Sequence, residues 1–114
     1  MQPIGRWAVQ EYLTADGSSP FSSWFAKLDA VAAAKVTVAL TRLEMGNTSS
    51  LKGIGGGLVE CRIDHGPGYR MYFASIGERW LLLLAGGTKR RQQHDIDAAR
   101  ARWMDYRQRR TDAR

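Results

Sequence analysis

The feature that most constrains the fold is an unbroken apolar run from Trp80 to Ala85. This run is far too short to cross a bilayer, which needs about 20 apolar residues in a helix. A short continuous apolar run is typical of a strand that is buried on both faces. We therefore expect residues 79–85 to form a strand at the centre of a sheet, entered through a turn at residues 76–78.

Three further segments have the alternating pattern of half-buried strands. Residues 6–13 alternate and are followed by an Asp-Gly pair that is typical of a turn. Residues 58–64 and 69–75 also alternate, and the His-Gly-Pro-Gly sequence between them has the composition of a hairpin connection. The sequence thus predicts four strands.

Two helices are predicted between the first and the second strand. Ser19 followed by Pro20 is typical of a capped helix start, and apolar residues then recur at helical spacing as far as Leu28. Asp29 can cap a second helix that continues through an alanine-rich stretch to Met45. We expect both apolar faces to pack in the core.

Residues 47–57 are polar and glycine-rich, which favours a mobile loop that carries Lys52. Residues 95–107 have the spacing of a last helix with one apolar face. The order of strand, two helices, three strands and helix favours an α+β fold, in which a helical hairpin packs on one side of a small antiparallel sheet. A chain of 114 residues suits one domain, so we expect residues 1–114 to form a single unit.

The charge and the single cysteine narrow the functional classes. Residues 89–110 hold eight basic and three acidic residues, so most of the net charge of +6 lies there. Such a field attracts RNA, DNA or an acidic protein, although a solvated helix face is an equal alternative. Cys61 has no partner for a disulfide, and Met1–Ile4 lacks a basic segment leading into an apolar stretch. We therefore expect a cytoplasmic location and no membrane partner.

The hairpin of residues 58–75 places polar side chains together. If the apolar sets of both strands share one face, odd positions must pair with odd positions, and this requires a bulge or an odd loop. Glu60, Arg62, Arg70 and Tyr72 then lie together on the other, open face. Cys61 falls on the core face, so we expect a buried apolar side chain and not a nucleophile.

Two arginines and a tyrosine beside a flexible lysine suit the cleavage of an RNA phosphodiester. Guanidinium groups stabilise the extra negative charge of the pentacoordinate phosphorus. The acid and the base remain open among five side chains: Tyr72, Lys52, His65, Glu60 and His94. The duller alternatives are that Glu60 and Arg62 form an exposed ion pair and that Tyr72 is packing.

Four sequence segments in this order closely resemble HigB-like addiction-module killer proteins of the RelE/ParE superfamily. The segments are GLVECRID (57–64), GPGYRMYF (66–73), LLAGGTK (83–89) and QQHDI (92–96). A composite pattern of this kind is more specific than one short motif. The resemblance implies the RelE/ParE fold and a toxin of a type II toxin–antitoxin system that inhibits growth.

By position, the resemblance implies roles for seven residues. Arg62 and Arg70 would bind phosphate and Tyr72 would donate a proton, which makes these three the candidate catalytic residues. The candidate RNA-binding residues are Lys52, Lys89, Arg90 and Arg91. His94 stands where this branch often has lysine, and Tyr106 is either a C-terminal catalytic aromatic residue or core.

The resemblance also implies the reaction and the partners. We expect a ribosome-dependent endoribonuclease, or mRNA interferase, that needs no metal and no organic cofactor. The expected partners are a cognate antitoxin with a helix-turn-helix, the ribosome with its mRNA, and operator DNA bound through the antitoxin complex. Two alternatives stay open because fold does not fix activity: a ParE-like inhibitor of DNA gyrase, and an inactive relative that only binds its antitoxin.

Overall fold

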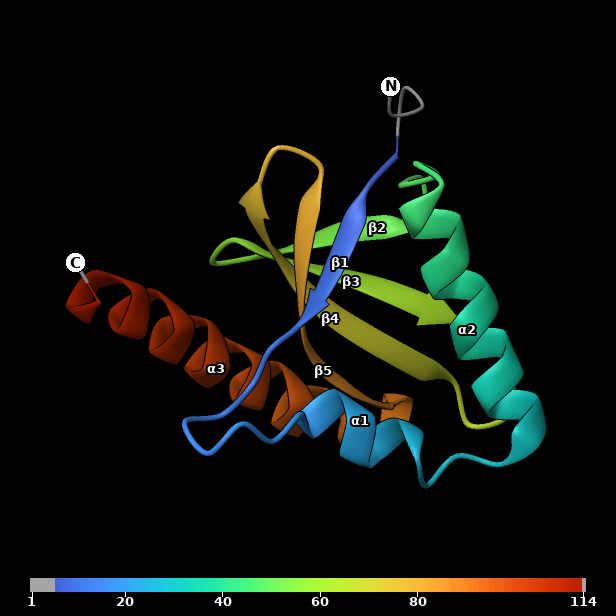
Figure 1. The fold of residues 1–114 in the computed structure, drawn as a ribbon. Coiled ribbons are helices and arrows are strands. Elements are labelled where there is room, and N and C mark those ends of the chain that lie inside the picture. Colours follow the sequence, from blue (N-terminus) through green and yellow to red (C-terminus); the bar gives the residue numbers. More distant parts are fainter. Residues whose placement is uncertain (1–5, 114) are drawn as a thin grey trace.

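The strand that contains the leucine run, β5 (Trp80–Thr88), lies inside a five-stranded sheet with the order β1-β5-β4-β3-β2 (Figure 1). The structure is a computed structural model that describes residues 6–113, so Met1–Ile4 lies outside the described residues. Residues 81–85 are all buried, because β5 has a neighbour on each side and a helical layer on each face. β5 is therefore an interior strand buried on both faces, as predicted, although β4 and not β5 lies at the centre of the sheet.

The other strands surround β5 in an arrangement that is mostly antiparallel. β4 (Tyr69–Gly77) pairs with β5 and with β3 (Leu58–Ile63), and both pairs are antiparallel. β1 (Ala8–Glu11), however, runs parallel to β5, which corrects the prediction of a wholly antiparallel sheet. Parallel neighbouring strands need a long connection. Here the segment from α1 through β4 connects β1 to β5.

The predicted loop at residues 47–57 contains a strand, which is the second correction. β2 (Leu51–Gly55) pairs with β3 and forms an edge of the sheet, so Lys52 lies on a strand and not on a mobile loop. The glycine-rich composition concealed this strand from sequence reasoning. The glycines serve the turn into β3, where residues 55–57 have φ of 89°, 66° and 83°, values that side-chain-bearing residues rarely adopt.

Two helices cover one face of the sheet, as predicted. α1 (Pro20–Phe25) begins after Ser19, whose hydroxyl caps it, and α2 (Ala30–Glu44) begins after Asp29, whose carboxylate accepts from the Ala32 amide. Their buried side chains form one core cluster with the apolar side of β3, β4 and β5. α1 lies over β5, whereas α2 lies across β1 and β3.

The last helix covers the opposite face, which sequence reasoning took to be open. α3 (Gln92–Asp112) follows a short 3₁₀ turn, η1 (Lys89–Arg91), and extends beyond the predicted 95–107 at both ends. Its stripe of Ile96, Ala99, Trp103 and Tyr106 packs on a second core cluster that includes Leu82 and Leu84. The apolar stripe of α3 and the apolar face of the sheet must both be removed from water, and they bury each other.

Two adjacent glycines, Gly86 and Gly87, leave the sheet without side chains on either face near the end of β5. A Cβ atom added to Gly86 would lie 2.3 Å from Cε3 of Trp24, and one added to Gly87 would lie 1.7 Å from the Asp95 carboxylate. Trp24 belongs to α1 and Asp95 to α3, so the two layers occupy the space of the missing side chains. Glycine in a strand interior often marks such a close approach.

We expect Gly86→Ala to lower the free energy of unfolding by about 2 kcal/mol, because its methyl group would overpack the Trp24 ring. Urea unfolding followed by tryptophan fluorescence measures the change. Gly53→Ala is the matched control in β2, where an added Cβ meets nothing within 4 Å. Equal stability of the two variants would contradict the close packing at Gly86.

Candidate functional site

The polar residues of β3 and β4 lie together on the side of the sheet that α3 covers. Glu60 is paired with Tyr72, and Arg62 with Arg70. The connection from Ile63 to Tyr69 is an odd loop of residues 64–68, which gives the predicted pairing of odd with odd positions. The clustering of these four residues is therefore confirmed.

Glu60 is the centre of this cluster. Its Oε1 accepts a hydrogen bond from Arg62 Nε at 2.8 Å, and its Oε2 accepts one from Gln92 Nε2 at 3.0 Å. Arg70 Nε lies 3.7 Å from the same Oε2. Glu60 is only 1% exposed, so its carboxylate relies on these three groups in place of water. It joins β3, β4 and the start of α3.

The face that holds the cluster is not open, because α3 closes over most of it. Tyr72 is 0% exposed and Arg70 is 6% exposed, whereas the Arg62 side chain is 54% exposed. Of the three candidate catalytic residues, only Arg62 is freely accessible to a ligand at the surface. The alternative of a Glu60–Arg62 ion pair is confirmed, but the pair is exposed only on the Arg62 side, since the Glu60 carboxylate is buried.

Three buried polar atoms of this region have no hydrogen-bond partner within residues 6–113: Arg70 Nε, Tyr72 Oη and Asp95 Oδ2. Burial raises the pKa of the Tyr72 phenol well above its usual value, and the Glu60 charge raises it further. Burial also raises the pKa of Asp95, against the opposing charges of Arg91, His94 and Arg102. Tyr72 is therefore held in its neutral form.

The candidate RNA-binding residues lie on the exposed edges around this cluster. Lys52 is exposed on β2 and pairs in register with Glu60. Lys89, Arg90 and Arg91 form η1 and are exposed. The Lys89 amide donates to the Gly68 carbonyl at 2.8 Å, which ties this basic turn to the β3–β4 connection. The structure thus places η1 beside the strands that carry Arg62 and Arg70.

The remaining candidates lie away from an open site. Cys61 is buried on the α2 side and burial raises the pKa of its thiol, in keeping with the predicted packing role. His65 stacks on Tyr69, and His94 is exposed. Tyr106 is half-buried against Trp103 in the second core cluster. Among the described residues, no three His, Cys, Asp or Glu side chains are grouped to hold a metal ion.

Sequence reasoning missed two residues of the cluster, Gln92 and Asp95. Gln92 gives Glu60 its second hydrogen bond, and Asp95 lies against Gly87. Neither has a signal of its own, because both lie at the start of a helix whose docking face is not fixed by the local sequence. The adjacent Gly86 and Gly87 inside a strand were the available indication of a close contact.

Comparison with known proteins identifies the family of this chain. The family model described as "Phage derived protein Gp49-like" matches residues 23–104. This chain belongs to the Gp49-like family. That family of phage-derived proteins is part of the RelE/ParE-like toxin superfamily, and the five-stranded α+β fold agrees with it. The matched residues include the seven candidate site residues of this Gp49-like protein.

A protein of Haemophilus influenzae described as uncharacterized is 40% identical to this Gp49-like chain over 81 residues. The alignment covers 70% of this chain and 82% of that protein. No helix described in this Gp49-like protein has both the length and the apolar character needed to cross a membrane.

We expect Arg70→Ala to lower the free energy of unfolding of this Gp49-like protein by about 3 kcal/mol, because it removes a buried cation beside the buried Glu60. Arg62→Ala is the variant at the paired position, and we expect a smaller loss because the Arg62 side chain is 54% exposed, so water can replace its hydrogen bond to Glu60. Chemical unfolding of both variants tests this. An Arg70→Ala protein as stable as the wild type would show that the cluster does not hold the fold.

The stability of the fold depends on pH through the Asp95 carboxyl. Because burial raises the pKa of Asp95, the folded chain retains this proton at pH values where the unfolded chain has lost it. The unfolded state is therefore favoured as the pH rises above the ordinary aspartate value of 3.8. We expect Asp95→Asn to be more stable than the wild type near neutral pH, with a gain that disappears below 3.8.

Unfolding curves at several pH values measure this difference. The matched control is Asp97→Asn, since Asp97 is an exposed aspartate two residues along α3. A gain for Asp95→Asn that stayed constant across the pH range would count against the burial effect.

Proposed function

We propose that this protein is the toxin of a type II toxin–antitoxin system, HigB-like, and that it acts in the cytoplasm as a ribosome-dependent endoribonuclease on mRNA. Membership of the Gp49-like family supports the assignment of this chain as a toxin. The observation that supports the nuclease activity is the exposed Arg62 guanidinium. Its Nε donates a hydrogen bond of 2.8 Å to the buried Glu60 carboxylate, and the basic turn η1 lies nearby.

Glu60 supports this role by fixing the direction of Arg62. The Arg62 guanidinium is charged, and the Glu60 hydrogen bond raises its pKa further. This hydrogen bond occupies Nε and leaves the two terminal nitrogens of the guanidinium for a phosphate. A charge that is already oriented stabilises a developing anion without a reorganisation step. We assign phosphate binding to Arg62 first.

In the proposed reaction the 2′-hydroxyl of RNA attacks the adjacent phosphorus. The bond between phosphorus and the 2′-oxygen forms, the bond to the 5′-oxygen breaks, and the product is a 2′,3′-cyclic phosphate with a free 5′-hydroxyl. The 2′-hydroxyl loses a proton and the leaving oxygen gains one. Arg62 stabilises the negative charge on phosphorus, and Lys52, Lys89, Arg90 and Arg91 hold the RNA backbone.

Burial gives Arg70 and Tyr72 different proposed roles. Arg70 lies under the surface beside Glu60, so it helps to hold the carboxylate that orients Arg62. Tyr72 would donate a proton to RNA only after α3 moves away, because the packed helix keeps its hydroxyl from the surface. These roles place Arg62 in contact with substrate and Arg70 behind it.

The proposed partners follow from this function. An antitoxin with a helix-turn-helix would neutralise the protein and carry it to operator DNA. The ribosome would present the mRNA. The dense positive charge of residues 89–110 supports contact with an RNA-rich surface.

The test is to map mRNA 5′ ends shortly after induction of the protein in growing bacteria. We expect new in-frame cuts with the wild type and a loss of about a hundredfold or more with Arg62→Ala, since one oriented charge contributes that much to a transition state. Lys27→Ala is the control, because Lys27 is exposed on the connection between α1 and α2. It should cut as the wild type does.

Three other outcomes of this induction experiment would contradict the proposal. Unchanged cuts in Arg62→Ala would remove Arg62 from the mechanism. Arrested growth with intact transcripts and DNA damage would assign the protein to gyrase inhibition. Harmless expression of a folded protein would indicate a relative that binds only its antitoxin.

A further inference from the structure

The Glu60 carboxylate lies between two arginines that are register partners on β3 and β4. Arg62 Nε lies 2.8 Å from Oε1 of Glu60, whereas Arg70 Nε lies 3.7 Å from Oε2. Only the first contact is a hydrogen bond, because the donor and the acceptor of such a bond are about 2.7–3.2 Å apart. One carboxylate therefore serves two cations unequally.

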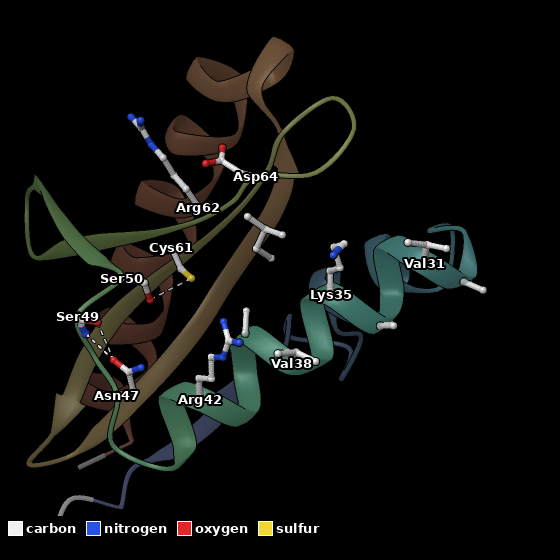
Figure 2. A pocket seen from close by; sticks show the side chains of 14 residues that line it. Val31, Lys35, Val38, Arg42, Asn47, Ser49, Ser50, Cys61, Arg62 and Asp64 are labelled. Carbon is white, nitrogen blue, oxygen red and sulfur yellow. Dashed lines mark hydrogen bonds between the residues drawn. The ribbon is translucent and has the colours of Figure 1, made fainter.

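Arg62 lies on the side of the sheet that faces α3. Figure 2 looks into a pocket of about 760 Å³ between α2 and β3, and the Arg62 guanidinium points away from this pocket. The neighbouring Cys61 side chain points to the opposite face, where its Sγ lies 3.7 Å from Ser50 Oγ. Successive residues of a strand alternate in this way. The direction of the guanidinium is thus determined by groups on the α3 side.

Burial alone favours the opposite choice of arginine. The Arg70 side chain is 7% exposed, and its Nε is a buried donor that has no hydrogen-bond partner among residues 6–113. The Arg62 side chain is 54% exposed, so water can replace a lost partner there. A buried donor without an acceptor costs more free energy than an exposed one. With no other contact, the carboxylate would therefore turn toward Arg70.

Gln92 supplies the contact that opposes this turn. Its Nε2 donates a hydrogen bond of 3.0 Å to Oε2 of Glu60, which is the oxygen beside Arg70. With Oε2 held in this way, Oε1 stays with Arg62. Gln92 is the first residue of α3, and α3 is fixed by its apolar stripe on the second core cluster. The hydrogen bond of Gln92 therefore depends on the docking of the helix.

We propose that Gln92 is a positioning residue, which holds the Glu60 carboxylate toward Arg62 and away from Arg70. The docking of α3 then determines the direction of the exposed guanidinium on the neighbouring strand. This inference rests on the proposed function, in which Arg62 binds phosphate, and it adds the residue that keeps Arg62 oriented. Gln92 acts through Glu60 and not by contact with RNA. Without it, the carboxylate pairs with Arg70, and Arg62 is released.

The test compares Gln92→Met with Gln93→Met by NMR of the arginine Nε–H groups in the full chain. Methionine is close to glutamine in length and cannot donate a hydrogen bond from its side chain. Gln93 is the matched control, because its Nε2 also donates to a carboxylate, that of Asp97 on the exposed side of α3. Arg62→Lys and Arg70→Lys each remove one signal from the spectrum and so assign both signals.

The two arginine signals should move in opposite directions in Gln92→Met. A hydrogen bond to a carboxylate moves an Nε–H proton to higher chemical shift and slows its exchange with water. We expect the Arg62 signal to move to lower shift and to exchange about tenfold faster or more, while the Arg70 signal moves to higher shift. A general loosening of the fold would not produce this reciprocal change. Gln93→Met should match the wild type.

A second variant separates the reach of the side chain from its polarity. Gln92→Asn keeps the amide but is one carbon shorter, so it should move both signals as Gln92→Met does. Urea unfolding checks that the variants fold. Unchanged signals in both Gln92 variants, or signals that move in the same direction, would overturn the inference.

Mapping of mRNA 5′ ends distinguishes this inference from the proposed function. If the wild type cuts mRNA, Gln92→Met should cut about tenfold less, because Arg62 keeps its charge and loses its orientation. Equal cutting by Gln92→Met and the wild type would overturn the positioning role. Opposite signal shifts in a protein that never cuts mRNA would keep the link between Gln92 and Arg62 and overturn the proposed function.

Discussion

Two neighbouring strands, β4 and β5, have apolar side chains on both faces, and the position of every helix depends on this. Each face must be removed from water, so one helix layer is needed on each side. α1 and α2 supply the first layer with a continuous apolar core. α3 supplies the second, although only Ala99 of its 21 residues is fully buried. The second layer is therefore narrow and has polar groups at its margin.

The buried Glu60 carboxylate lies at that margin and decides its electrostatic character. A carboxylate taken from water is unstable unless cations and donors replace the lost hydration. Arg62, Gln92 and Arg70 do this from two strands and a helix. The arrangement leaves Arg62 at the surface with a fixed direction, while its register partner Arg70 is enclosed. Two arginines in paired positions thus have unequal access to a ligand.

The sequence predicted what local patterns determine. Caps at Ser19 and Asp29 gave the starts of α1 and α2, and the alternation in β3 and β4 gave their register. It failed where distant segments decide the outcome. β2 is a strand because β3 offers it an edge, and Tyr72 is buried because α3 docks there. The polar cluster was predicted, but its depth and the role of Gln92 depend on that docking.

The two glycines at the end of β5 connect the two faces of the sheet. Trp24 of α1 fills the space of one missing side chain, and Asp95 of α3 fills the space of the other. Between them the protein is only one peptide backbone thick. In most of a sheet, side chains on each face separate the backbone from the layers packed on it, and at these two glycines no such side chains are present. A shift of the backbone at Gly86 and Gly87 would therefore alter the contacts of α1 and of α3 together.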